Sequence, residues 1–315
     1  MKLIDQSRLQ VRKFADPDIT ADGKTRASVA LLGLRTLWFN TGSLCNLTCV
    51  NCYIESSPRN DRLVYLTLAD VTAYLDQIDA LGLPTREIGF TGGEPFMNPA
   101  IIELLAASLS RGYHTLVLTN AMRPMTKHAD ALLDLRTRYG AKLVMRVSID
   151  HHRPDLHEEL RGRHTWTPTL RGLKWLADNG FALNVAGRLR WGDGEAAMRD
   201  GYANLFADNG IPLNALDPVE LVLFPEMDEH ASVPEITTEC WDILHKRPQD
   251  MMCASSRMVV KHKDAAAPTI VSCTLLPYDP QFDLGPHLEN ALGPIKLNHP
   301  HCAKFCVLGG GRCSA

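Results

Sequence analysis

The sequence predicts an α/β protein: a partial (β/α)6 TIM-like barrel followed by a small cysteine-rich C-terminal extension. Between residues 34 and 224, six short apolar segments alternate with five segments of helical periodicity. Of the nine cysteines, three lie within residues 45–52 and five within residues 253–315. The composition, 45% hydrophobic and 22% charged, is that of an ordinary globular protein.

The expected elements follow from the alternation. Expected strands are 34–40, 86–90, 115–118, 142–149, 181–189 and 219–224, and expected helices are 67–81, 98–111, 126–139, 167–179 and 195–209. Thr67 and Asp70 have the spacing of a capping box, with Asp in the acidic position. Successive strand–helix repeats predict a parallel sheet with right-handed crossovers. This span is shorter than the ~250 residues of an eight-unit barrel, so a six-unit barrel is expected, with a flat doubly wound sheet as the alternative.

Composition changes divide the chain into four expected regions. They are a lead-in (1–33), the barrel (34–224), a connecting segment (225–252) with a helix near 235–245, and the extension (253–315). The extension has only two short strand signals, 258–262 and 269–272, and many Pro and Gly residues. Such a segment cannot build a good apolar core, so a bound metal group is expected to hold it together.

Several classes of protein are disfavoured. The net charge of −3 shows no basic excess, so no nucleic-acid partner is expected. No segment approaches the ~20 apolar residues of a membrane span, and the N-terminus has no apolar core of a signal peptide. The expected location is the cytoplasm. An odd number of cysteines in a reducing compartment favours metal binding over disulfides.

The first cysteine group, Cys45, Cys49 and Cys52, has the spacing C-x3-C-x2-C and directly follows the first expected strand. Barrels place their chemistry at this carboxyl end of the strands. Three thiolates suit three irons of a [4Fe–4S] cluster and leave the fourth iron open to a small molecule. A zinc ion with a fourth ligand from elsewhere is the alternative.

Polar residues follow the next strands at the same edge. Gly92, Gly93 and Glu94 close the second strand, and Asn120 follows the third. Ser148 and Asp150 end the fourth strand, and Arg161 precedes a glycine further on. Glycines let the backbone approach a ligand closely, and Glu94 offers a carboxylate to an amine. Taken singly, each of these motifs is also compatible with an ordinary turn.

The order of four motifs along the chain resembles that of the radical S-adenosylmethionine (SAM) enzymes. The motifs are CNLTCVNCY, GGEP, SID and RG. In that family, the amino and carboxylate groups of SAM chelate the open iron. One electron from the cluster then cleaves a C–S bond of SAM, and the resulting 5′-deoxyadenosyl radical takes a hydrogen atom from the substrate. The resemblance therefore implies an external one-electron reductant of the flavodoxin or ferredoxin type, and a small-molecule or peptide substrate.

The resemblance also implies roles for single residues. The GGE motif, with Glu94, would bind the SAM amino group, Arg161 would meet the SAM carboxylate, and Ser148 and Asp150 would face the ribose or the substrate. Asn120 lies at the same rim. One position departs from the family pattern, which has an aromatic residue just before the third cysteine. Here Asn51 stands there, and the aromatic residue is Tyr53.

The C-terminal cysteines Cys253, Cys273, Cys302, Cys306 and Cys313 resemble the Twitch and SPASM extensions of that family, in which a hairpin separates the first two cysteines. A full SPASM domain has seven cysteines, so the shorter Twitch type with one auxiliary [4Fe–4S] cluster is implied. Which four cysteines would bind it stays open, and a structural zinc is the alternative. Cys240 stands apart and is expected to be a buried small apolar residue.

The predicted function is that of a radical SAM enzyme catalysing a net oxidation or a bond formation assisted by the auxiliary cluster. The alternatives are a zinc-stabilised α/β binding or regulatory protein and an Fe–S electron carrier. An Fe–S electron carrier would need neither the GGEP motif nor an iron without a protein ligand.

Overall fold

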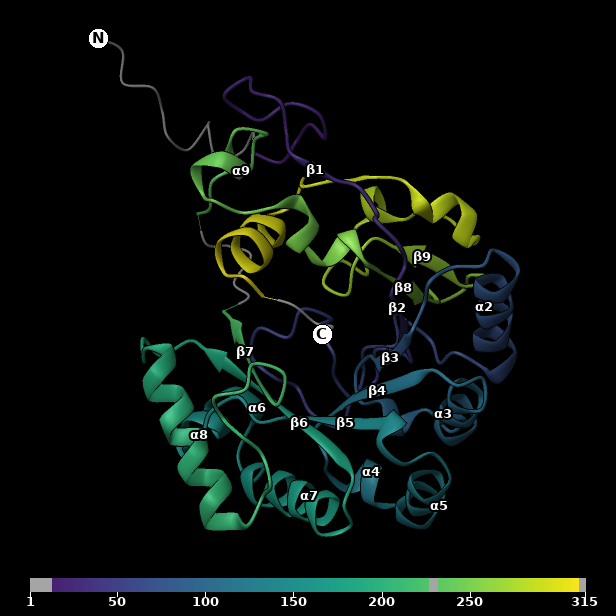
Figure 1. Cartoon of the computed structure of the whole chain (residues 1–315), viewed down its shortest axis with the longest axis vertical. Coiled ribbons are helices and arrows are strands. Elements are labelled where there is room, and N and C mark those ends of the chain that lie inside the picture. Colours follow the sequence, from purple (N-terminus) through teal and green to yellow (C-terminus); the bar gives the residue numbers. More distant parts are fainter. Residues whose placement is uncertain (1–12, 227–231, 312–315) are drawn as a thin grey trace.

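The structure, a computed structural model, describes residues 13–226 and 232–311. Its centre is a curved eight-stranded sheet with the order β7-β6-β5-β4-β3-β2-β8-β9 (Figure 1). Its strands are β2 (Thr36–Asn40), β3 (Glu87–Thr91), β4 (His114–Thr119), β5 (Leu143–Ser148), β6 (Ala182–Leu189), β7 (Leu221–Pro225), β8 (Ser256–Val260) and β9 (Thr269–Val271). Neighbouring strands are parallel except β8 and β9. The predicted partial parallel barrel is therefore confirmed.

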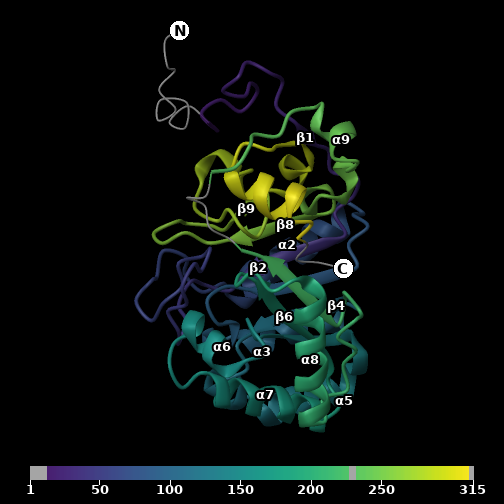
Figure 2. The same ribbon diagram turned by 90° about the vertical axis from the view of Figure 1, so that its left-hand side faces the viewer.

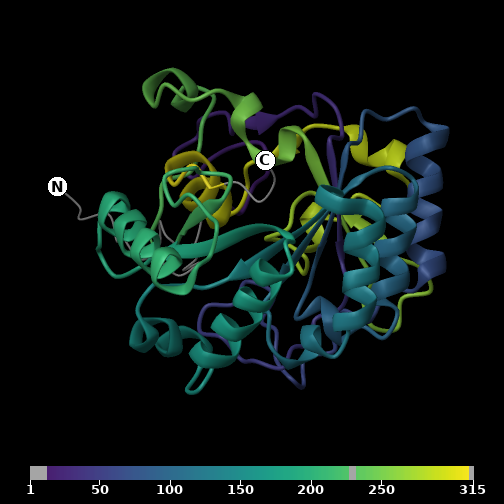
Figure 3. The same ribbon diagram turned by 60° about the horizontal axis from the view of Figure 1, so that its bottom comes forward.

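Helices cover the outer side of the sheet (Figures 1 and 3). They are α2 (Leu68–Ala80), α3 (Ile101–Ser110), α4 (Arg123–Thr126), α5 (Ala129–Tyr139), α6 (Pro154–Arg161), α7 (Trp166–Asp178) and α8 (Glu195–Asn209). The short helix α9 (Cys240–Ile243) lies apart from them, near β1. The capping box of Thr67 and Asp70 forms at the start of α2. No helix in the described part of the chain combines the length and apolar character that crossing a membrane requires.

Short helical turns complete the described elements. The 3-10 turns are η1 (Pro95–Met97), η2 (Gly140–Lys142), η3 (Pro248–Asp250), η4 (Met252–Ala254), η5 (Pro280–Phe282) and η6 (Leu288–Leu292), and η7 (Cys302–Leu308) is a π-helix. Three of these turns have a proline at N1 or N2, where its missing N–H leaves no bond unmade.

Some helices differ from the sequence prediction. The helix expected over 126–139 begins later, as α5 at Ala129, and a separate short helix that was not predicted, α4, precedes it across a turn at Lys127 and His128. The helix expected near 235–245 is reduced to the four residues of α9. Helix α6 was not predicted, although Pro154 at its first turn and Gly162 after its end are ordinary boundary signals.

The extension continues the barrel sheet. Strand β8 pairs in parallel with β2, from Thr36 opposite Ser256 to Phe39 opposite Val259. The two-residue strand β1 (Ser28–Val29) pairs with β10 (Ile295–Lys296), so the lead-in packs against the C-terminal region. Figures 1 and 2 show both at one end of the molecule, away from α5, α7 and α8. The four expected regional boundaries stay predictions.

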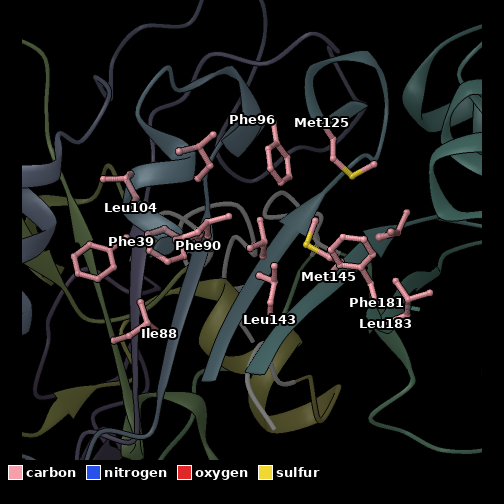
Figure 4. Close-up of a cluster of buried hydrophobic side chains, with 14 of the residues drawn as sticks. Phe39, Ile88, Phe90, Phe96, Leu104, Met125, Leu143, Met145, Phe181 and Leu183 are labelled. Carbon is pink, nitrogen blue, oxygen red and sulfur yellow. The ribbon is translucent and has the colours of Figure 1, made fainter. Parts of the chain in front are cut away.

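The alternation of β2 separates two buried clusters. Leu37 and Phe39 face the helices and join a large cluster with side chains of β3, β5 and β6 (Figure 4). Trp38 points to the opposite face and joins the second cluster, which contains Met258 and Phe305 of the extension. Because successive side chains of a strand point to opposite faces, one strand serves both cores.

We expect Gly172→Ala to lower the free energy of unfolding by about 1–3 kcal/mol. Alanine is normally the better helix former, but a Cβ at Gly172 of α7 would lie 1.8 Å from the carbonyl oxygen of Ala121. Urea unfolding measures the difference. Gly293→Ala is the control, since its φ is −69° and a Cβ there meets nothing within 4 Å. Equal stability of the two variants would contradict this packing.

Candidate active site

A pocket opens at the carboxyl ends of the parallel strands and brings together the residues expected there. It has a volume of about 680 Å³, its open mouth included. The expected site residues that line it are Cys45, Cys49, Cys52, Gly92, Gly93, Asn120, Ser148, Asp150 and Arg161. Tyr53 and Arg188 line it as well. The one expected residue of this group that does not reach the wall is Glu94.

The glycines after β3 hold the cysteine loop. The Gly93 N–H donates to the Gly42 carbonyl (2.7 Å), and the Glu94 N–H donates to the Leu44 carbonyl (3.1 Å). A Cβ on Gly93 would lie 2.0 Å from the Leu44 oxygen. We expected these glycines to admit a ligand. They do border the pocket. At position 93, however, a glycine is needed mainly because the turn after β3 and the cysteine loop approach each other closely.

Two of the three thiols at the pocket, those of Cys45 and Cys49, lie in a poorly solvated place. Burial raises the pKa of Cys45 to about 12, and the neighbouring Glu94 carboxylate adds to the effect. Burial also raises the pKa of Cys49, while Arg161 opposes the rise. The thiolate is the metal-binding form, so binding a metal group here would displace protons from these thiols.

The described residues include no group of three or more His, Cys, Asp or Glu arranged around a single metal ion. A single zinc ion needs its donors gathered at one point. A cluster of four irons and four sulfides keeps its three protein ligands apart by its own width. The donor set therefore fits a cluster with one open iron better than a preformed zinc site.

Glu94 lies behind the wall of the pocket. Its carboxylate accepts hydrogen bonds from the Thr119 hydroxyl (2.8 Å), the Asn120 N–H (2.8 Å) and the Phe96 N–H (3.2 Å). Burial raises its pKa to about 7, against the opposing effect of these bonds. The side chain thus joins the turn after β3 to the end of β4. Its assignment as the ligand of an amine stays a prediction.

Asp150 and Arg161 form a bidentate ion pair at the pocket. Arg161 Nε lies 2.6 Å and Nη2 lies 3.2 Å from the two carboxylate oxygens of Asp150. Arg188 Nε lies 3.7 Å from the same carboxylate. Burial alone would raise the pKa of Asp150, but Arg161 and Arg188 outweigh it and hold that pKa below its usual value. The carboxylate is therefore ionised at neutral pH.

Arg188 also fixes the cysteine loop from the side of β6. Its Nη2 donates to the Asn51 carbonyl at 3.1 Å, between the second and third cysteines. The Val50 N–H donates to the Leu160 carbonyl of α6 at 2.8 Å. This role of the Arg188 side chain is not predicted from the sequence. An arginine within the otherwise apolar segment 182–189 was the available signal.

The C-terminal cysteines gather in the second buried cluster. Cys253 lies in η4, Cys273 follows β9, and Cys302 and Cys306 lie on η7. Burial raises the pKa of Cys253 to about 11 and that of Cys302 well above its usual value. Cys273 and Cys253 raise the Cys302 pKa further, so these three thiols lie close enough to interact. Cys313 lies outside the described residues.

Cys240 differs from its prediction. It was expected to be buried, and it is half-buried at the start of α9. Its Sγ accepts a hydrogen bond from the Thr237 N–H at 3.4 Å.

A buried arginine accompanies the C-terminal cysteines. Arg257 of β8 is fully buried, and its guanidinium donates to the carbonyls of Cys253, Ser256, Ala291 and Gly293. No carboxylate of the described residues forms an ion pair with it. Burial lowers its pKa, and the opposing charges are those of the Cys253 and Cys273 thiolates. A buried charge of this kind requires a compensating one.

The raised pKa of Glu94 predicts a pH-dependent stability. A carboxyl whose pKa is higher in the folded state stabilises the fold most below its unfolded pKa of 4.5, and this contribution disappears as pH rises through about 7. We expect Glu94→Gln to remove up to about 3 kcal/mol of this dependence. Urea unfolding between these pH values measures it, with exposed Glu103→Gln as the control. A Glu94→Gln profile parallel to that of the unmodified chain would contradict the assignment.

Comparison with known proteins agrees with this geometry. Residues 39–189 match the Radical SAM superfamily. The chain is 33% identical over 143 residues to the antilisterial bacteriocin subtilosin biosynthesis protein AlbA of Bacillus subtilis, which is 45% of this chain and 30% of AlbA. It is 28% identical over 144 residues to an AdoMet-dependent heme synthase of Nitratidesulfovibrio vulgaris, covering 45% and 36%. The matches span about a third of these relatives' length.

Solved structures show the same fold at low identity. Streptococcus suis SuiB bound to S-adenosylmethionine superposes with a TM-score of 0.59 and 13% identity, over 81% of this chain and 64% of that one. The enzyme anSMEcpe with bound AdoMet gives a TM-score of 0.58 and 13% identity, over 82% and 79%. The family match, the three cysteines at one pocket and the shared fold agree: residues 39–189 belong to the radical SAM superfamily.

Proposed function

We propose that Cys45, Cys49 and Cys52 hold a [4Fe–4S] cluster and that SAM binds beside it in the pocket. The observation that carries the proposal is that all three cysteines line one pocket with polar residues from the ends of three further strands. When bound, such a cluster supplies the electron that cleaves SAM and so starts hydrogen abstraction from a substrate. The remaining chemistry belongs to the residues of the chain.

The pocket offers complementary groups to an amino acid and a ribose. Arg161 uses Nε and Nη2 on Asp150, which leaves Nη1 to bind a carboxylate. Ser148 and Asn120 offer hydrogen-bonding groups to ribose hydroxyls from the ends of β5 and β4. The Asp150 carboxylate lines the pocket and the Glu94 carboxylate lies behind its wall, and both would favour an ammonium or sulfonium cation nearby.

We assign the C-terminal cysteines to one auxiliary [4Fe–4S] cluster. Cys253, Cys273 and Cys302 interact, Cys306 lies one helical turn beyond Cys302, and Arg257 supplies a buried positive charge beside them. Four cluster-bound thiolates would compensate that charge. The auxiliary cluster would assist a net oxidation or a bond formation.

The substrate class is a peptide or a small molecule. Two of the matched proteins support a peptide: AlbA is named a bacteriocin biosynthesis protein, and SuiB has been solved bound to the precursor peptide SuiA. Heme synthases also match over a similar span, so the shared region is compatible with both classes.

We expect Cys49→Ala to abolish 5′-deoxyadenosine formation and to remove about four of about eight irons per chain after anaerobic reconstitution. The reason is that three ligands are the minimum for a cluster with one open iron. Chromatography of the nucleoside and iron analysis measure both effects.

Cys240→Ala is the matched control, because Cys240 lies outside both cysteine groups and should retain iron and activity. No 5′-deoxyadenosine from the iron-loaded unmodified chain, SAM and dithionite would reject the proposed function.

The auxiliary assignment predicts that Arg257 raises the reduction potential of the second cluster, because a nearby positive charge favours the added electron. In a Cys45→Ala/Cys49→Ala/Cys52→Ala background, we expect Arg257→Met to shift the midpoint potential to more negative values. Arg257→Lys, which keeps the charge, should stay near the parent. EPR-monitored redox titration measures all three.

Two different outcomes of this experiment would contradict different parts of the prediction. An iron-free triple-cysteine background would reject the auxiliary cluster. A cluster whose potential is the same in the parent, Arg257→Lys and Arg257→Met would leave the cluster and reject the role of Arg257.

A further inference from the structure

The cluster of the proposed function must receive an electron while SAM fills the pocket. The donor therefore needs a second approach to the cysteine loop, outside that pocket. Arg188 closes the loop at Asn51, and the Asn51 side chain donates to Glu226 at 2.8 Å. The Tyr278 hydroxyl donates to the Ile54 carbonyl at 3.0 Å and so covers the segment that follows Cys52. Asn46, the residue after Cys45, instead borders a separate groove.

A groove lies on the other side of the loop at Asn46. It has a volume of about 1110 Å³, its open side included, and lies between η1 and α4. Phe96, Met97 and Pro124 give it an apolar surface. Phe96 belongs to the buried core, so this surface rests on a rigid support (Figure 4).

The rim of the groove is basic. Arg123 and Lys127 are exposed on and after α4, and neither pairs with a carboxylate of the described residues. His128 lies beside them, with its ring centroid 6.0 Å from that of Phe96. None of the residues lining the groove is acidic, although the whole chain carries a net charge of −3. This local reversal of sign favours an acidic partner and speeds its encounter.

The wall between groove and cluster site is one residue thick. Asn46 lines the groove, and Cys45, to which it is bonded, lines the pocket. The Asn46 side chain is fixed on both sides, since its Oδ1 accepts from Asn120 Nδ2 (2.9 Å) and its Nδ2 contacts Met122 Sδ (3.7 Å). A donor seated in the groove would approach the Cys45 ligand through this short, rigid wall.

We propose that this groove is the docking surface for an acidic one-electron carrier protein, of the flavodoxin or ferredoxin type. The proposal rests on the proposed function. One electron passes from the reduced carrier to the oxidised cluster, the carrier is oxidised by one electron, and no covalent bond forms or breaks between them. An apolar centre with a charged rim suits a complex that forms and separates at each turnover.

The test compares two reductants on the iron-loaded full chain with SAM. We expect Arg123→Glu/Lys127→Glu to lower the rate of 5′-deoxyadenosine formation about tenfold or more with a reduced acidic flavodoxin. With dithionite, a small reductant, the rate should match that of the unmodified chain. Raising the ionic strength should slow the flavodoxin reaction of the unmodified chain and bring it towards that of the variant.

Arg86→Glu/Lys142→Glu is the matched control. It makes the same charge change at exposed residues before β3 and β5, at the opposite ends of the strands. We expect it to keep the flavodoxin rate. Equal slowing by both pairs, or no slowing by the groove pair, would overturn the docking surface.

A loss confined to substrate modification, with 5′-deoxyadenosine formation from flavodoxin intact, would also overturn it and assign the groove to a peptide. A failure of the proposed function is recognised separately, since it abolishes product with dithionite as well.

Discussion

The contact on which the site depends is the pair of backbone hydrogen bonds between the turn after β3 and the cysteine loop. Gly93 and Glu94 donate to Gly42 and Leu44, and no side chain larger than hydrogen fits at Gly93. Parallel strands bring their carboxyl ends to one edge, but they do not fix the loops there. These two bonds fix the loop relative to the sheet.

The remaining contacts extend this anchor around the edge. Glu94 reaches the end of β4 through Thr119 and Asn120, and Asn120 reaches back to Asn46 of the cysteine loop. From the opposite side, Arg188 holds Asn51. The loop is therefore held at its beginning and its end by different strands. This arrangement gives the three thiols defined positions before any metal binds.

Much of this was readable from the sequence, because its signals are local. The six parallel strands, the capping box at Thr67 and the lining of the pocket by the cysteines follow from periodicity and spacing. The pairing of β8 with β2 was not readable, since it joins segments more than 200 residues apart and no local signal specifies a partner. The helix expected near 235–245 shortened to α9, a stretch in which Ile243 is largely exposed and apolar packing is weak. The Arg188 contacts depend on the same long-range arrangement.

The two candidate metal sites differ in how the buried charge beside them is compensated. At the pocket, Asp150 faces two arginines, so its charge is compensated within the protein. At the extension, Arg257 is equally buried; its hydrogen bonds to described residues go to carbonyls, and the charges that act on it are those of the Cys253 and Cys273 thiolates. A buried cation without a carboxylate is stable only beside another anion, and cysteine thiolates are the anions within reach. The Asp150 carboxylate is thus paired within the protein, whereas Arg257 gains an anionic partner when the neighbouring thiols are deprotonated, which is what binding a metal group requires.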